Sequence, residues 1–125
     1  MVSHGQFAWN ELNTRDIERA KRFYGATLGW TFSAMPMPDG TYWVAMAGDV
    51  PAGGLFGISA PMFDGMPEHW FAYIEVDDVD KRVAGVEAAG GQIMRPAWDV
   101  PTVGRIAIVK DSGGAVMGWM TSVQR

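Results

Sequence analysis

The sequence contains no cysteine, which excludes disulfides, thiolate metal sites and a cysteine nucleophile together. Its ten Lys and Arg residues are scattered and outnumbered by fourteen Asp and Glu, for a net charge of −4. We expect no nucleic-acid partner, because phosphate binding requires clustered basic side chains. No stretch approaches the roughly 20 apolar residues of a membrane helix, and the opening MVSHGQFAWNEL has no secretion-signal pattern. We therefore expect a cytoplasmic protein with no membrane partner.

The chain does contain enough apolar sequence for one core, and it contains an internal repeat. It has 125 residues, of which 48% are hydrophobic and 19% charged, so we expect a single domain over residues 1–125. A gapless shift of 62 residues aligns Asp16 with Asp78 and Asp49 with Asp111 and preserves residue class at strands, helix starts and turns. Two repeats are expected, at about 6–59 and 68–121, joined by a linker over 60–67.

Each repeat shows the same succession of patterns. The segments QFAWNELNT and HWFAYIEVD are rich in aromatic and β-branched residues, which is typical of strands. Asp16 and Asp78 follow where a helix N-cap is needed. Apolar stripes then predict two helices, ended by Gly29 and by Gly90-Gly91. The stripes are Ile17, Ala20, Phe23, Tyr24 and Leu28 in the first helix, and Val79, Val83 and Val86 in the second. Three strands are expected after each helix, near 31–37, 41–47 and 53–59, and near 92–95, 104–110 and 115–121.

This combination resembles a known family. The pattern D-[IV]-[ED]-[RK] follows each first strand, FYGATLGW ends the first helix, and GRIAIVKDSGGA forms a strand and turn. Together they resemble the vicinal oxygen chelate superfamily, which includes glyoxalase I, extradiol dioxygenases and bleomycin resistance proteins. The resemblance implies an α+β fold in which two βαβββ repeats form a curled mixed-sheet cup, and a homodimer in which the partner completes the cup. One such scaffold hosts many functions, so the reaction does not follow from it.

The positions that hold metal in this family carry no metal-binding side chain here. In its metal-dependent members, ligands stand seven residues before each helix-capping Asp and seven after each turn Asp. Those positions are Trp9, Phe71, Phe56 and Gly118 in this sequence, and none supplies an imidazole or carboxylate. A slip of two residues finds only Glu11, Tyr73, Gly54 and Met120, too few donors for an ion. We therefore expect no metal and no cofactor.

The floor of the implied cup is expected to be aromatic with few polar groups, as small-molecule sites usually are. Glu11 is the candidate cation anchor or proton acceptor, because desolvation among aromatic rings would change its ionisation. The predicted ligand-binding residues are Trp9, Glu11, Phe56, Phe71, Tyr73, Gly118 and Met120. Alternatively, the aromatic residues form only a core, and Glu11 pairs with an Arg or lies at a solvated rim. His69 is expected to make a structural hydrogen bond or to lie at a rim. The glycines of AGGLFG are expected to serve a bulge or a close approach of neighbouring groups.

Two functions from different classes follow. The first is a metal-free binding protein for a hydrophobic or aromatic small molecule, and the acidic charge favours a cationic ligand. The second is a lyase or isomerase of the glyoxalase type, using Glu11 as a base or a displaced metal site. The absence of the family's metal ligands favours the first. A third possibility is that core side chains fill the cup, so that it serves only packing and binds no ligand.

Overall fold

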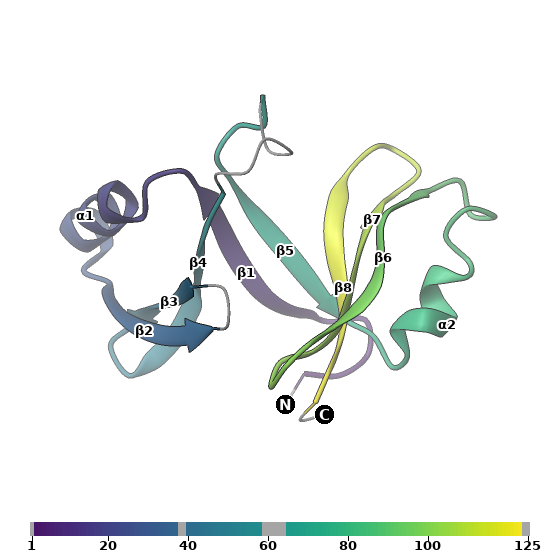
Figure 1. The fold of residues 1–125 in the computed structure, drawn as a ribbon, viewed down its shortest axis with the longest axis horizontal. Helices are drawn as coiled ribbons and strands as arrows, with labels where there is room; N and C mark the ends of the chain where they lie inside the picture. Colours follow the sequence, from purple (N-terminus) through teal and green to yellow (C-terminus); the bar gives the residue numbers. More distant parts are fainter. Residues whose placement is uncertain (1, 38–39, 59–64, 124–125) are drawn as a thin grey trace. The chain divides into compact units, whose positions relative to one another are not determined.

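The computed structural model describes residues 2–37, 40–58 and 65–123, and its elements follow the order βαβββ twice (Figure 1). The first set comprises β1 (Phe7–Thr14), α1 (Ile17–Leu28), β2 (Thr31–Met37), β3 (Gly40–Ala47) and β4 (Val50–Gly57). The second comprises β5 (His69–Glu75), α2 (Val79–Val83), β6 (Gln92–Val100), β7 (Gly104–Lys110) and β8 (Val116–Ser122). The predicted α+β fold with two βαβββ repeats is confirmed.

Both helices begin at the predicted aspartates. The Asp16 side chain accepts a hydrogen bond from the backbone N–H of Arg19 at 3.0 Å, and Asp78 accepts one from Lys81 at 3.2 Å. Each carboxylate thus satisfies a backbone donor that has no partner within its helix. Gly29 ends α1 in the left-handed conformation, with φ +73°, and its N–H donates to the carbonyl of Gly25, as expected for a glycine cap.

The chain forms two compact units. Residues Asn10–Trp70 form one, here called the α1 unit, and Met1–Trp9 with Phe71–Arg125 form the other, called the α2 unit. In the α1 unit the strands are ordered β2-β3-β4-β1, and in the α2 unit β5-β8-β7-β6. The pairs β1/β4 and β5/β8 are parallel and the other neighbours within each unit antiparallel, so both sheets are mixed. Most of the predicted linker, at 60–64, lies outside the described residues.

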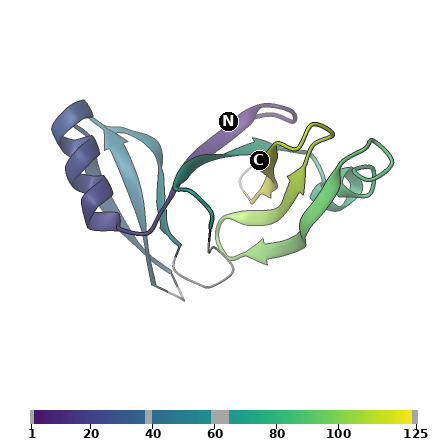
Figure 2. The same cartoon turned by 90° about the horizontal axis from the view of Figure 1, so that it is seen from above.

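One face of each sheet packs against the helix of the same unit. In the α1 unit this core is built on Leu12, Ala20, Ala45 and Leu55, with α1 lying along the strands (Figure 2). In the α2 unit it is built on Val76, Val79 and Ala107. Because successive strand residues point to opposite faces, the residues that alternate with these lie on the other side of each sheet. We call that side the helix-free face of the unit.

Two predictions about the helices are corrected by the structure. The second helix was expected to carry Val86, but α2 ends at Val83 and turns follow as far as Gly90. Gly85 lies in this continuation, and a glycine there disfavours further helix by about 1 kcal/mol relative to alanine. In α1, Phe23 and Leu28 were expected on the core stripe but are 59% and 58% exposed, because the core of this unit contacts a narrower face of the helix, centred on Ala20.

One strand is longer than predicted. β6 was expected to end near residue 95 but continues to Val100 through Pro96. Its pairing with β7 shifts register between Ile93 and Arg95 and again between Arg95 and Trp98. A proline is tolerated at such irregularities on the outermost strand of a sheet, because the N–H that it lacks is not needed there for a hydrogen bond to a neighbouring strand.

Candidate functional site

The predicted site residues are divided between the two units. Glu11 and Phe56 belong to the α1 unit. The α2 unit contains Trp9, Phe71, Tyr73, Gly118 and Met120.

In the α2 unit, aromatic rings cover the helix-free face around Gly118. Tyr73 pairs with Gly118 on the neighbouring parallel strand, and its ring contacts Phe71 edge-on, with centroids 5.2 Å apart at 75°. A Cβ atom added to Gly118 would lie 2.3 Å from Cδ1 of Tyr73 and 3.2 Å from Cε2 of Phe71. Gly118 therefore provides the space in which the Tyr73 ring lies, and any larger residue would displace it.

The same face carries a buried carboxylate that sequence reasoning did not select. Glu75 is 1% exposed, and its Oε2 accepts hydrogen bonds from the backbone N–H and the hydroxyl of Ser122, at 3.0 and 3.2 Å. Its strand neighbour is Met120, which is 8% exposed. The position of Glu75 two residues after Tyr73 was the available signal. Trp9 is half-buried at the end of the β1 segment that belongs to this unit.

In the α1 unit, Glu11 lies on the helix-free face and is buried. It is 8% exposed and pairs with Gly54 of the parallel strand β4. Phe56, two residues further along β4, pairs with Asn13 and is 42% exposed. Tyr42, which the sequence did not single out, extends over Gly54: a Cβ atom there would lie 1.7 Å from the Tyr42 hydroxyl oxygen. Both units thus use a glycine to accommodate a tyrosine ring.

The histidine near this face makes structural hydrogen bonds, as predicted. His69 Nε2 lies 3.2 Å from the amide nitrogen of Asn13, and its Nδ1 lies 2.8 Å from the carbonyl oxygen of Pro67. Since a carbonyl can only accept, Nδ1 donates to Pro67 and Nε2 accepts from Asn13. This assigns the imidazole to positioning the end of β1.

These residues do not fit the metal site of the family. Trp9, Phe56 and Phe71 have hydrocarbon or indole side chains and Gly118 has none, so the four ligand positions lack suitable donors. Within 2–37, 40–58 and 65–123 there is no group of three or more His, Asp and Glu side chains that could hold an ion.

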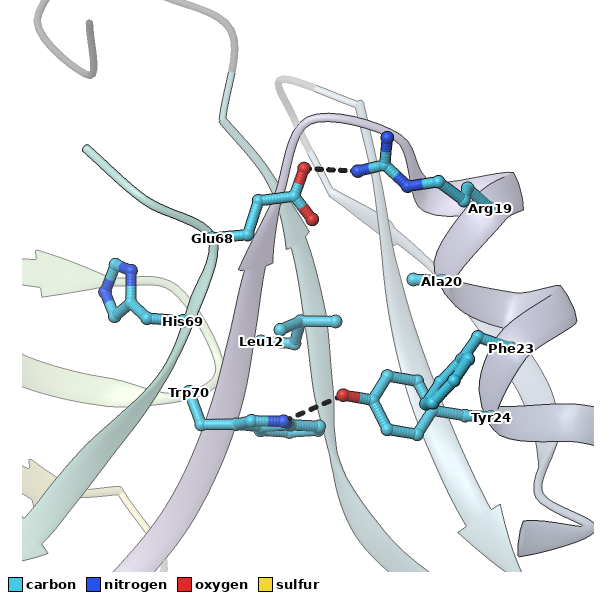
Figure 3. Close-up of a pocket in the computed structure, with 8 residues that line it drawn as sticks. All are labelled: Leu12, Arg19, Ala20, Phe23, Tyr24, Glu68, His69 and Trp70. Carbon is cyan, nitrogen blue, oxygen red and sulfur yellow. Dashed lines mark hydrogen bonds and ion pairs between the residues drawn. The ribbon is translucent and has the colours of Figure 1, made fainter. Parts of the chain in front are cut away.

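A separate pocket lies on the helix side of the α1 unit, with a volume of about 340 Å³ (Figure 3). In this view Leu12 lies between Glu68 and Arg19 above and Tyr24 and Trp70 below, and the indole N–H of Trp70 donates to the Tyr24 hydroxyl at 3.0 Å. The remaining lining residues are Arg19, Ala20, Phe23, Glu68 and His69. Tyr24 also stacks on Trp30, with centroids 5.3 Å apart. These contacts hold the aromatic side chains of α1 and of the start of β5 together along one wall of the pocket.

One end of this pocket is closed by an ion pair. Glu68 accepts a hydrogen bond from the buried Thr14 hydroxyl at 2.7 Å and another from the backbone N–H of Arg15 at 3.2 Å, and it pairs with the Arg19 guanidinium. The Thr14 hydroxyl, followed by Arg19, lowers the pKa of Glu68 to about 2. The carboxylate ties the end of β1 and the first turn of α1 to the start of β5, which is a stabilising role.

The two mixed sheets, each with a helix on one face and aromatic side chains on the other, define a glyoxalase-like α+β protein. The chain belongs to the Glyoxalase/Bleomycin resistance protein/Dioxygenase superfamily, whose family profile matches residues 6–117. It is 42% identical, over 90% of its length, to CFP32 of Mycobacterium tuberculosis, a protein provisionally named as a glyoxylase. It is 30% identical, over 95% of its length, to the anthracycline biosynthesis protein DnrV of Streptomyces peucetius.

The chain spans 42% of the length of CFP32 and 48% of that of DnrV. Among solved structures, the hypothetical protein BH1468 of Bacillus halodurans is similar in fold, with a TM-score of 0.74 and 12% identity over 98% of both chains. In the described part of the chain, no helix has the length and apolar character needed to cross a membrane.

Proposed function

We propose that this chain is a metal-free binding domain in which the helix-free face of each unit, taken by itself, can bind a planar, hydrophobic small molecule. The observation that carries the proposal is the replacement of the family's metal ligands by Trp9, Phe56, Phe71 and Gly118, with the Tyr73 ring lying in the space left by Gly118. Aromatic faces bind flat apolar ligands through stacking and edge contacts, each contributing about 0.5–1.5 kcal/mol beyond burial of area.

The charge of the chain favours a ligand with a positive group. The net charge is −4, and Glu11 places a carboxylate, 8% exposed, on the helix-free face of the α1 unit. A desolvated carboxylate gains most from a cationic or hydrogen-bond-donating partner. Anthracyclines are planar polycyclic compounds, so the name of DnrV supports the same ligand class.

We further propose that the chain acts as a homodimer. In the hydrogen-bonded order of the described strands, β2 ends the sheet of the α1 unit and β6 that of the α2 unit. Such terminal strands present unpaired backbone groups that a partner can cover. Exposed apolar side chains such as Phe23, Leu28 and Met94 add area that favours association.

A second candidate function is a lyase or isomerase in which Glu11 removes a proton. The observation that favours it is the burial of Glu11, because a desolvated carboxylate is a stronger base. Incubating the protein in D₂O with the hemithioacetal of methylglyoxal and glutathione tests it. Deuterium incorporation into the substrate that is lost in Glu11→Gln would favour this enzyme function over the binding function.

Titration with doxorubicin, a fluorescent cationic anthracycline, tests the binding function. We expect saturable binding that Phe71→Leu and Tyr73→Leu each weaken about 2- to 12-fold, since each removes one aromatic contact. Glu11→Gln should lower the affinity for doxorubicin more than it lowers the affinity for N-acetylated doxorubicin, which is uncharged. Glu87→Gln, an exposed carboxylate, and Phe23→Leu, on the helix side, are matched controls. Absence of saturable binding, or loss only on Phe23→Leu, would contradict the proposal.

A further inference from the structure

We propose that Tyr42 and Glu11 form one recognition pair on the helix-free face of the α1 unit, and that Gly54 creates the space that brings them together. The pair would bind a protonated amine carried by a planar ligand. This inference rests on the function proposed above and adds Tyr42 and Gly54 to its site.

The position of the Tyr42 side chain depends on the absence of a side chain at Gly54. A Cβ atom built on Gly54 would lie 1.7 Å from the Tyr42 hydroxyl oxygen, 2.3 Å from Cζ and 2.8 Å from Cε2. Contacts this short are not tolerated between atoms that are not bonded to each other. The phenol end of Tyr42 therefore occupies the place that a side chain at residue 54 would take.

Glu11 is the direct neighbour of that place. Glu11 and Gly54 are paired residues of the parallel strands β1 and β4, so their side-chain positions share one face of the sheet. Adjacent strands lie about 4.8 Å apart, which puts the Tyr42 hydroxyl about 3–7 Å from Cβ of Glu11. Beyond Cβ, the glutamate side chain continues through one methylene, Cγ, to the carboxyl group, which is long enough for its carboxylate to extend to the hydroxyl.

The chemistry of the two groups is complementary. A phenol hydroxyl donates and a carboxylate accepts, and a hydrogen bond to the carboxylate stabilises its charged form. Glu11 is 8% exposed, so such a donor offsets part of the cost of keeping a charge away from water. A carboxylate held in one orientation then selects a ligand with a cationic donor over an uncharged analogue of the same shape.

Two single substitutions separate this pair from the rest of the site. Gly54→Ala should push the Tyr42 ring aside, and Tyr42→Phe removes the hydroxyl alone. We expect each to lower doxorubicin affinity about tenfold or more, because a hydrogen bond to a charged group is lost, and to leave the affinity for N-acetylated doxorubicin nearly unchanged. Gly57→Ala and Tyr24→Phe are the matched controls, since a Cβ at Gly57 meets only Ile17 Cγ1 at 3.9 Å and Tyr24 lies on the helix side.

The outcomes distinguish this pair from the wider function. Phe71→Leu and Tyr73→Leu could weaken doxorubicin binding while Gly54→Ala and Tyr42→Phe do not. That result would refute the recognition role of the pair and leave the binding function supported. If the unmodified protein does not bind doxorubicin, the binding function and the recognition role both fail.

A measurement without ligand tests the pairing itself. We expect the urea midpoint of the Glu11→Gln, Tyr42→Phe double variant to be no lower than that of the more damaging single variant, because either change breaks the same contact. Midpoint shifts that simply add would overturn the proposed contact. Melting curves of Gly54→Ala verify that it is folded before its affinity is interpreted.

Discussion

Replacing Glu68 by glutamine should destabilise the protein at neutral pH and have little effect in acid. The carboxylate accepts hydrogen bonds from Thr14 and from the backbone of Arg15 and pairs with Arg19. Its pKa is lowered from 4.5 to about 2, so its stabilising contribution is fully present above pH 4.5 and is lost as pH falls toward 2. Glutamine keeps the shape and one acceptor oxygen but not the charge.

The size of the effect follows from the exposure of the two partners. The full shift would correspond to about 3 kcal/mol, but the Glu68 and Arg19 side chains are 32% and 56% exposed. Water screens pairs of this kind, so we expect Glu68→Gln to lower the unfolding free energy by about 1–2 kcal/mol at pH 7. At pH 2.5 the difference from the unmodified protein should fall to less than half of that.

Urea unfolding at pH 7, 4.5, 3.5 and 2.5 measures this dependence, with Glu87→Gln as the control for removing one exposed carboxylate. A loss of stability that is equal at pH 7 and pH 2.5 would show that the charge of Glu68 is irrelevant. A loss no larger than that of Glu87→Gln would refute the stabilising role of the ion pair.

Four further results are expected. Leu55→Ala, at a side chain that is 0% exposed, should lower the unfolding free energy by about 2–5 kcal/mol, whereas Val50→Ala, at 63% exposure, should change it by less than about 0.5 kcal/mol. Asp111→Ala should lower the urea midpoint, because the Asp111 carboxylate accepts hydrogen bonds from the N–H groups of Gly113 and Ala115 at 2.8 and 2.9 Å. Asp111→Asn, which keeps one acceptor oxygen, should lower the midpoint less. Sedimentation velocity at micromolar concentration should return twice the 13.6 kDa chain mass, and a monomer would contradict the dimer. Elemental analysis should find Zn, Ni, Fe and Mn all far below one per chain. A metal that is present at one per chain and is lost in Glu11→Gln would favour the lyase or isomerase function.

Local signals were sufficient to predict the order of the elements. Asp16 and Asp78 cap their helices because capping depends on a single side chain and the three residues that follow. The exposure of Phe23 could not be predicted, because the apolar stripe fixes only which helix face is apolar. How much of that face the sheet covers depends on tertiary packing. The apolar spacing of Val79, Val83 and Val86 predicted a helix as far as Gly90-Gly91, but α2 ends at Val83, because Gly85 disfavours a further helical turn.

The candidate site was only partly accessible from sequence. Alternation along strands placed Phe71 and Tyr73 on one face, and the structure brings their rings into contact. The relation of Tyr42 to Gly54 was not accessible, because it depends on how β3 lies beside β4 and on the rotamer of a long side chain. The glycines of AGGLFG were expected to serve a bulge or a close approach. Gly54 allows a close approach, but the approaching group could not be named without the strand register.

Titration of the isotope-labelled protein with doxorubicin, followed by two-dimensional ¹⁵N–¹H NMR, tests the central claim most directly. Gly54, Phe71, Tyr73 and Gly118 contribute to the helix-free faces, whereas Tyr24 lines the helix-side pocket. Our account predicts saturable shifts at the amides of the first four residues and little change at Tyr24. Shifts confined to Tyr24 and its neighbours, or no saturable shift at all, would contradict it.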